Sequence, residues 1–429
     1  MPPRTASPRT ASPRSHPTLG LCTILHGFTH AYGSMLVPLY FRIAEDLKLS
    51  GVGAATLIVT LYGATYNLGS WTGGVAADRF SRKTLLAIGL FGNAAAILGI
   101  GLSREYPAIL ALAMAAGIFG AIFHPAANAL ATSHYPKSPG MAIGILGIGS
   151  GLGFFFGPQI AGWRAASARW HFANVAQWQK PCVEMAIAGF LVGIIFLLVA
   201  RDPDGARVTG QSRKMDPSLR RKMVRLALVL MFRDFAGVAG LSLAAIYVRN
   251  VFGLSVGEAG LFVGIMMLPS VIVNPLAVYL TPRRRRLPGL TTILIAGGLI
   301  VATTPMWGVH GALVILCAFQ TMQLASYAVS DAATLERVSS HVRGRVVGLF
   351  LLIAGTFGAT GPWAMGSWTD RLAAAHVQAS YAIPFALLGA CMLIASMAPR
   401  LIGRLGPVLS ESPMRPAQEI SPETMGAVP

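Results

Sequence analysis

The sequence predicts an all-α membrane protein, with twelve transmembrane helices arranged as two pseudo-symmetric six-helix bundles. Its composition indicates a membrane protein, because 54% of the 429 residues are hydrophobic and only 12% are charged, whereas soluble domains carry about 25% charged residues. Long apolar runs give the number of helices, and an internal repeat gives the two bundles. The predicted fold class rests on these three observations together.

Apolar runs long enough to cross a bilayer occur twelve times along the chain. A spanning helix needs about 20 mostly apolar residues, and the runs are separated by segments in which charged residues and proline gather. The predicted spans are residues 19–41, 54–77, 84–103, 107–132, 140–162, 182–200, 224–248, 258–281, 289–307, 311–335, 345–368 and 379–399.

The segments around these spans define the expected domains. Residues 1–17 repeat the sequence PRTAS, and its prolines and lack of apolar surface predict a disordered basic N-terminal tail. The run from Leu19 to Ile43 is too long for the core of a secretory signal, so we interpret it as a retained first span. The other domains are an N-terminal bundle (18–200), a cytoplasmic central loop (201–223), a C-terminal bundle (224–399) and a C-terminal tail (400–429).

The basic residues predict the orientation. If both termini are cytoplasmic, 25 of the 34 Lys and Arg residues lie in cytoplasmic segments and 8 in external loops, and Arg233 is left inside a span. This excess is the positive-inside pattern of multi-pass membrane proteins. We therefore expect a protein of the plasma (inner) membrane with both termini in the cytoplasm.

The two halves of the chain repeat each other. Residues 140–162 (GMAIGILGIGSGLGFFFGPQIAG) align with 344–366 (GRVVGLFLLIAGTFGATGPWAMG) at five glycines and a proline, each pair separated by 204 residues. The same offset places Arg79 on Arg283 and Arg82 on Arg286. Two parallel six-helix halves are the layout of many secondary transporters, which bind substrate at the midplane between them. The glycines also favour close helix packing.

Several classes of function are excluded or disfavoured. The net charge of +18 does not indicate nucleic-acid binding, because the basic residues lie in short clusters between apolar runs. The four cysteines lie in or beside apolar runs without CxxC spacing, so we interpret them as small hydrophobic residues rather than as disulfides or a zinc site. No nucleotide loop or nucleophile–base spacing occurs, so we expect neither an enzyme, nor a cofactor, nor an ATP-driven pump.

The segment GVAADRFSRK (74–83) resembles the loop between the second and third helices of the major facilitator superfamily. Its gating residues would be Gly74, Asp78, Arg79, Arg82 and Lys83. An acid at a helix end followed by cations can pair with a neighbouring helix and stabilise one conformation, although an ordinary basic loop that only sets topology is the alternative. The equivalent loop LTPRRRRLP has Pro282 in place of Asp78, so we expect no equivalent latch in the second half.

Two further resemblances concern the direction of transport and the branch. In the span 140–162, Gly144, Gly153, Gly157–Pro158 and Ala161–Gly162 resemble the superfamily's antiporter signature, which implies export. HGFTHAYGSMLVPLY (26–40) and the FHP at 123–125 resemble the fosmidomycin-resistance branch. The resemblance implies that relatives carry an acid at the position of His30. Because this chain has a histidine there, a carboxylate proton site on the first helix is not expected.

Ionisable residues inside spans are candidates for binding substrate or coupling a proton. In the superfamily's fold, the helices that carry them line a central cavity. We expect His30 with Asp234 or Asp331 to carry the coupling proton, and Arg233 to act as counter-ion or substrate anchor. The alternatives are histidines that only bridge helices and an internal Arg233–Asp234 ion pair. The full candidate set is His26, His30, His124, Arg233, Asp234, Gln323, Tyr327 and Asp331, the last three lying with Gln320 on one polar stripe.

The predicted function is secondary transport of a small organic molecule, most simply proton-coupled efflux by a monomer in the lipid bilayer. Import of a nutrient or organic acid with protons is the alternative on the same fold. A more remote alternative is a metal-binding or metal-transporting membrane protein that uses His26, His30 and His124, because three imidazoles suit zinc. A membrane enzyme or receptor without transport has no supporting motif.

Overall fold

The computed structural model describes residues 17–135, 138–167, 175–202, 215–339, 342–374 and 381–408. Within these ranges the regular elements are helical, and ten helices are long and apolar enough to cross a membrane. Helices α1 (Thr18–Ser34) and α3 (Val52–Arg79), at the first two predicted spans, pack in the same assembly. The predicted all-α membrane fold is confirmed, and twelve spans are consistent with it. The predicted tails, except for Pro17 and 400–408, and residues 203–214 of the central loop lie outside the described residues.

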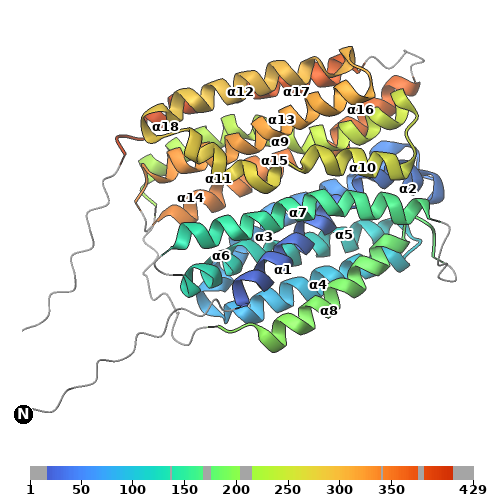
Figure 1. Ribbon diagram of the computed structural model, residues 1–429, viewed down its shortest axis with the longest axis horizontal. Helices are drawn as coiled ribbons and strands as arrows, with labels where there is room; N and C mark the ends of the chain where they lie inside the picture. Colours follow the sequence, from blue (N-terminus) through green and yellow to red (C-terminus); the bar gives the residue numbers. More distant parts are fainter. Residues whose placement is uncertain are drawn as a thin grey trace, which may run out of the picture.

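The first half of the chain forms the lower layer in Figure 1, coloured blue to green. After α1 come the short helices η1 (Val37–Leu39) and α2 (Tyr40–Asp46), then α3, α4 (Arg82–Leu102), α5 (Tyr106–Ala121), α6 (Phe123–His134), α7 (Pro139–Ala166) and α8 (Lys180–Val199). Helix α1 packs along α7, and α4 packs between α5 and α8.

The second half forms the upper layer, coloured yellow to red. It contains α9 (Pro217–Phe252), α10 (Val256–Met267), α11 (Ser270–Leu280), η2 (Arg283–Arg285), α12 (Arg286–Ala302), η3 (Thr304–Met306), α13 (Val309–Leu335), α14 (Arg343–Phe350), the π-helical η5 (Leu351–Gly355), α15 (Thr356–Gly358), α16 (Gly361–Ala374), α17 (Ala382–Ala395) and α18 (Ala398–Gly403). Helix α12 packs against α13 and α17, and α17 packs against α9.

Several predicted spans are interrupted; two of the breaks follow from proline, and a third is a π-helical turn. A proline cannot donate a hydrogen bond to the carbonyl four residues earlier. Pro125 therefore frees the carbonyl of Ala121, where α5 ends, and Pro269 frees that of Ile265 near the end of α10. The backbone N–H of Leu268 and the thiol of Cys317 donate to the Ile265 carbonyl instead. The third break is the π-helical turn η5, a local widening of the kind often found at functional sites.

The two ends of the molecule are distinguished by the chain connections. The backbone N–H of Arg201, just after α8, donates to Thr18 at the start of α1 (3.0 Å). Lys222 near the start of α9 donates to the carbonyl of Arg404, just after α18 (3.3 Å). We call this end the termini side; it lies at the left in Figure 1, where α6 and α18 end and α14 begins. The opposite end, with α2, is the far side.

The two halves meet along α3 with α16 and along α7 with α10 and α11. Glycines allow the second contact: a Cβ on Gly162 would lie 2.6 Å from the carbonyl oxygen of Val256, and one on Gly260 would lie 2.5 Å from that of Pro158. Hydrogen bonds join the halves toward the far side, where Tyr40 contacts Ser242 at 2.9 Å.

Candidate functional site

Three histidines from two helices meet inside the first half. His26 and His30 lie on one face of α1, because residues four apart on a helix are neighbours. His124 lies in the first turn of α6, two residues after Ile122, where the helix is interrupted because Pro125 cannot donate to the carbonyl of Ala121. We call these three residues the histidine cluster. One nitrogen atom from each ring lies within 4.8 Å of the others.

Hydrogen bonds fix the protonation pattern of two of the rings. His26 Nδ1 lies 2.6 Å from the carbonyl oxygen of Leu146 on α7, and because a carbonyl can only accept, Nδ1 carries the proton. In a neutral ring, His26 Nε2 is then an acceptor. His30 Nε2 lies 3.0 Å from it and donates. His124 makes no hydrogen bond within the described part of the chain.

Aromatic rings enclose the histidine cluster. Phe123 stacks on His26 with centroids 4.7 Å apart, and Phe154 tilts against His30 at 4.5 Å. The Tyr66 ring meets His124 edge-on at 6.0 Å, and its hydroxyl is buried without a hydrogen-bond partner among the described residues. His26 is 6% exposed, and the other two histidines are partly exposed.

Glycines of α7 bring this helix close enough for the Leu146 contact. A Cβ on Gly149 would lie 2.0 Å from the carbonyl oxygen of Thr23, and one on Gly153 would lie 2.2 Å from that of Gly27. Since real side chains never approach that closely, only glycine permits this spacing of α1 and α7. Gly157 repeats the contact one turn later, where an added Cβ would lie 2.8 Å from the Cα of Ala31.

A second polar cluster lies on α9 and α13. Arg233 is 4% exposed and pairs with Asp234, the closest N–O distance being 2.8 Å. It also donates to the hydroxyl of Ser330 (2.7 Å), and its guanidinium carbon lies 3.7 Å from the ring centroid of Tyr327. Asp331 is exposed. We call Arg233, Asp234, Tyr327 and Asp331 the arginine cluster.

The rest of the polar stripe on α13 faces neighbouring helices. Gln323 is buried against α9, where a Cβ on Gly237 would lie 2.1 Å from its amide nitrogen. Gln320 is buried and contacts the sulfur of Met267 (3.2 Å). The stripe therefore contributes to helix packing at Gln320 and Gln323, and Asp331 is its exposed end.

The predicted candidates therefore fall into two groups. The structure brings His26, His30 and His124 together, and separately Arg233, Asp234, Tyr327 and Asp331. No hydrogen bond or ion pair joins the two clusters in the part of the chain that the structure describes. The expected partnership of His30 with Asp234 or Asp331 is therefore not a direct contact in this conformation.

The predicted gating residues lie on the termini side, at the end of α3 and the start of α4. The side chains of Gly74, Asp78 and Arg79 lie outside the described residues. Arg82 is buried and donates to the carbonyl of Ala129 on α6 (3.2 Å). The backbone N–H of Lys83 donates to Asp202 (3.3 Å), which also accepts from the Ser81 hydroxyl (2.8 Å). Gly157 and Pro158 lie in helix contacts, with α1 and α10 respectively.

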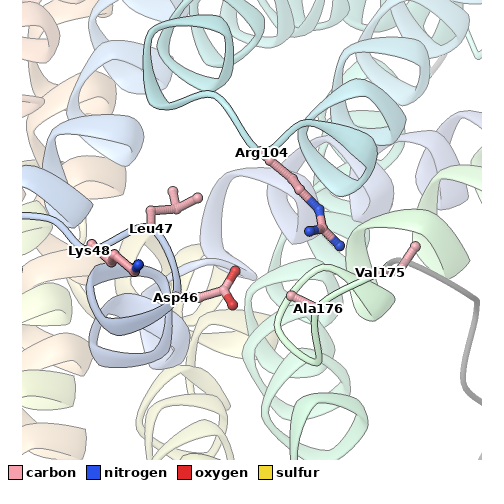
Figure 2. A pocket seen from close by; sticks show the side chains of 6 residues that line it. All are labelled: Asp46, Leu47, Lys48, Arg104, Val175 and Ala176. Carbon is pink, nitrogen blue, oxygen red and sulfur yellow. The ribbon is translucent and has the colours of Figure 1, made fainter.

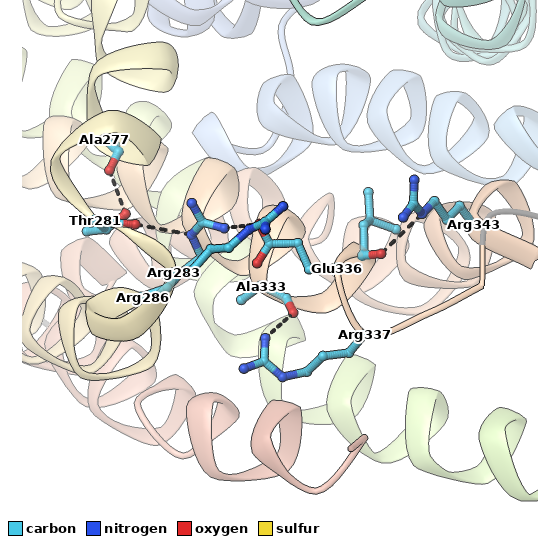
Figure 3. A network of polar contacts seen from close by, with 9 residues as sticks. Ala277, Thr281, Arg283, Arg286, Ala333, Glu336, Arg337 and Arg343 are labelled. Carbon is cyan, nitrogen blue, oxygen red and sulfur yellow. Dashed lines mark hydrogen bonds and ion pairs between the residues drawn. The ribbon is translucent and has the colours of Figure 1, made fainter. Parts of the chain in front are cut away.

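The second half has an ion pair where the sequence predicted none. Figure 3 shows Arg283 and Arg286 directed at Glu336, just after α13. Arg283 lies 3.2 Å from its carboxylate, and Arg286 pairs with the same oxygen. Pro282 does leave this loop without an acid equivalent to Asp78, but an ion pair forms here all the same, because its acid comes from a different helix, 50 residues further along the chain.

Several other polar contacts in the fold are not indicated by any local sequence pattern. The carboxylate of Asp370 on α16 accepts from the backbone N–H groups of Val52 and Gly53 at 2.9 and 2.7 Å. Arg164 pairs with Glu184 at 2.5 Å. A far-side cavity of about 320 Å³, shown in Figure 2, is lined by Asp46, Leu47, Lys48, Arg104, Val175 and Ala176, and its Asp46 already accepts from Trp178 (3.0 Å).

Comparison with known families supports the gating-loop resemblance. The sequence profile of the Major Facilitator Superfamily matches residues 19–362. This chain belongs to the Major Facilitator Superfamily. The match confirms the superfamily inferred from GVAADRFSRK, and it makes the chain a multi-pass membrane transporter. The narrower fosmidomycin-resistance branch stays a prediction.

Individual relatives agree with this assignment. The chain is 24% identical over 338 residues to multidrug resistance protein 1 of Bacillus subtilis (strain 168), covering 76% of this chain and 83% of the relative. It is 25% identical over 283 residues to the probable nitrate/nitrite antiporter NarK1 of Thermus thermophilus, covering 63% and 62%. A crystal structure of a bacterial homolog of the human lysosomal transporter Spinster, inward-facing and occupied, has the same fold (TM-score 0.73, 19% identity, 92% and 98% covered).

Proposed function

We propose that this transporter exports a small organic molecule in exchange for protons, by alternating access between its two halves. The observation that carries the proposal is the arginine cluster: a buried cation and two carboxylates lie inside spanning helices, where ionisable groups are costly and usually functional. The antiporter-like glycines of α7 and the relative named multidrug resistance protein 1 support the direction. Proton-coupled import of an organic acid is the alternative, and an anion-binding Arg233 suits both.

Within the cluster, we assign the coupling proton to Asp331. Asp234 is held by Arg233 through a close ion pair, so its carboxylate is already neutralised by a partner. Asp331 is exposed and makes no hydrogen bond or ion pair among the described residues. A carboxylate near a guanidinium, but not bonded to it, can gain and lose a proton without breaking the fold. His30 is bonded to His26 in the other cluster, which leaves it less free for this role.

We further propose that the termini side faces the cytoplasm and that each six-helix half moves as a unit. The excess of basic residues on that side supports this orientation. The hydrogen bonds of Tyr40 with Ser242 and of Asp370 with the start of α3 then lie toward the exterior. These contacts must break when the transporter opens outward, so they hold the external gate closed in the conformation described.

Arg233 points to an anionic substrate, because a buried guanidinium binds carboxylate or phosphonate groups through paired hydrogen bonds. The branch resemblance of residues 26–40 and 123–125 makes fosmidomycin, which carries a phosphonate, the first compound to test. An anionic substrate that takes the place of Asp234 as the partner of Arg233 would break the Arg233–Asp234 ion pair, and anion binding would then be linked to a rearrangement of the cluster.

The test is resistance to toxic compounds in a bacterial host that lacks its own pumps. The panel contains fosmidomycin, other anionic antibiotics and hydrophobic cations, and it compares wild type with Asp331→Asn and with Asp216→Asn, a control at an exposed carboxylate outside the spans. We expect resistance to one compound class, lost in Asp331→Asn and kept in the control at equal expression. Resistance that survives Asp331→Asn refutes the assigned proton carrier. No resistance with protein present in the membrane refutes export and favours import.

A further inference from the structure

We propose that the histidine cluster binds one divalent transition-metal cation of the zinc class, held by His26, His30 and His124 with a fourth position open. The inference does not depend on the proposed export, because it rests on a different cluster. Neutral imidazole nitrogens are ligands that zinc, copper and nickel accept. Three such nitrogens on two helices, with no cationic side chain in contact among the described residues, form a donor set for a metal rather than for an anion.

The spacing of the donors is close to that of a tetrahedral site. A metal–nitrogen distance of about 2.0–2.1 Å places neighbouring ligand nitrogens roughly 3.4 Å apart. His26 Nε2 and His30 Nε2 are 3.0 Å apart, and the full set lies within 4.8 Å. Closing the site requires His124 to approach by about 1.5 Å at most, a movement that a side-chain rotation in the first turn of α6 can provide.

The carbonyl of Leu146 already serves as the outer partner that metal-binding histidines require. A ligating histidine almost always donates its other ring N–H to a carbonyl or carboxylate, which fixes the tautomer and directs the lone pair. His26 Nδ1 donates to Leu146 at 2.6 Å, so His26 Nε2 presents its lone pair to the other two rings. The glycine contacts of Gly149 and Gly153 hold α7 at the distance that this bond needs.

Without a cation, the cluster leaves polar groups unpaired. His26 and His30 share one hydrogen bond, and a bridging cation would replace it: the proton of His30 moves from Nε2 to Nδ1, so the ring stays neutral and coordinates through Nε2. His124 gains a partner that it lacks among the described residues. The buried Tyr66 hydroxyl beside His124 is also without a partner in the described chain, and a fourth ligand could supply one.

The charge balance predicts the kind of fourth ligand. No carboxylate contacts the histidine cluster in the described part of the chain, so a divalent cation would bring uncompensated charge into a membrane interior. Burying an unpaired charge is costly. We therefore expect the fourth ligand to be a small anion, hydroxide or chloride, rather than a protein side chain.

The experiment uses the full chain, purified in detergent through a tag without histidine. Zinc content after equilibration with Zn²⁺ and dialysis is measured by mass spectrometry, and Co²⁺ is added separately to look for the strong visible absorption of tetrahedral cobalt. We expect one cation per chain in wild type, loss of at least tenfold in affinity in His30→Ala and His124→Ala, and no change in His310→Ala, whose histidine is exposed at the start of α13.

The outcomes separate the proposal from a folding defect and from export. Each variant must elute as a single species of unchanged size, and the wild-type cobalt spectrum needs no variant at all. Absence of tetrahedral absorption in wild type, or zinc content equal in wild type and the His30→Ala, His124→Ala double variant, overturns the proposal. The metal readout needs neither substrate nor gradient, and the resistance panel needs no bound metal. The metal site and the proposed export can therefore fail independently of each other.

Discussion

The histidine cluster and the arginine cluster occupy corresponding places in the two halves but contain opposite chemistry. His30 and Asp234 are 204 residues apart, the offset of the internal repeat. The first half presents three imidazoles between aromatic rings, and the second presents a guanidinium with two carboxylates. The first half therefore offers the lone pairs of neutral imidazole nitrogens, and the second half offers the charges of a guanidinium and two carboxylates. The repeat has kept its helix positions while the side chains at those positions have diverged.

The helix contacts behind the two clusters are, by contrast, repeated. Gly157 packs against the backbone of α1 at Ala31, and its repeat partner Gly361 packs against the backbone of α9 at Ala239, where a Cβ would lie 2.8 Å from the nitrogen. In both halves the glycine-rich fifth span lies directly on the first span. Close packing thus sets the scaffold, and the residues on it decide what each half binds.

Removal of Arg233 should have the largest effect. Arg233→Met leaves Asp234 as an unpaired buried charge, and breaking a buried pair in this way costs about 3–5 kcal/mol. We expect a sharply reduced folded fraction and complete loss of transport. Fluorescence-detected size-exclusion chromatography after heating gives the stability, and resistance or uptake assays give the transport.

The double variant Arg233→Met, Asp234→Leu separates the two effects. It removes both charges, so stability should recover by most of the amount lost, because replacing a whole buried pair by apolar residues is close to neutral. Transport should stay absent. Recovery of transport in the double variant would show that the pair is structural, and the contrast between the two clusters would lose its functional meaning.

Asp331→Asn should abolish gradient-driven transport without destabilising the fold. The amide mimics a permanently protonated carboxyl, so the proton cannot be released, whereas exposure of the side chain makes the change of stability small. In liposomes we expect substrate exchange to continue and concentration driven by a pH gradient to stop. The same two assays on His30→Gln test the histidine cluster. If His30→Gln keeps its coupling while Asp331→Asn loses it, the coupling proton belongs to the second half. Uncoupling by His30→Gln alone would reverse the assignment.

The glycine stripe of α7 offers a matched pair of substitutions two residues apart. Gly149→Ala introduces a Cβ 2.0 Å from the carbonyl oxygen of Thr23, whereas nothing lies within 4 Å of a Cβ at Gly147. We expect Gly149→Ala to cost about 1–3 kcal/mol by overpacking, and to weaken the histidine cluster by moving Leu146. Gly147→Ala should gain about 0.5–1 kcal/mol from helix propensity. Equal melting temperatures for the two variants would contradict the packing described.

Sequence patterns predicted the elements of the fold because a bilayer imposes length and apolarity on every span. They also grouped His26 with His30, since four residues on a helix is a fixed geometry, and they marked Arg233 and Asp234 as unusual. The breaks at Ile122 and Leu268 follow from Pro125 and Pro269, but a continuous apolar run concealed them. The periodicity of apolar residues alone could not show where these two helices are interrupted.

Contacts between distant segments could not be predicted in the same way. The sequence suggested one set of charges around a shared cavity, whereas the structure separates two clusters, because helix rotation and close glycine contacts decide which faces meet. Glu336 was not expected to pair with Arg283, since no local pattern connects them. The contact of Asp370 with the start of α3 joins residues 318 positions apart, and it is visible only in three dimensions.

Asp370 should give the smallest effect, and it tests what holds the two halves together at the far side. Helix α3 begins after Gly51, which has no side chain to cap the free N–H groups, and Asp370 on the other half supplies the carboxylate. A charge at a helix N-terminus contributes about 0.3–1 kcal/mol, so Asp370→Asn should shift the equilibrium toward outward opening by up to roughly fivefold. Thr60 on α3 is buried against α16, where its hydroxyl accepts from the backbone N–H of Trp363 (3.1 Å). In a background without the four native cysteines, a cysteine at this position reports the shift as faster labelling from the outside. Unchanged labelling in Asp370→Asn, with Asp216→Asn as the control, would show that helix packing alone holds the halves together at the far side.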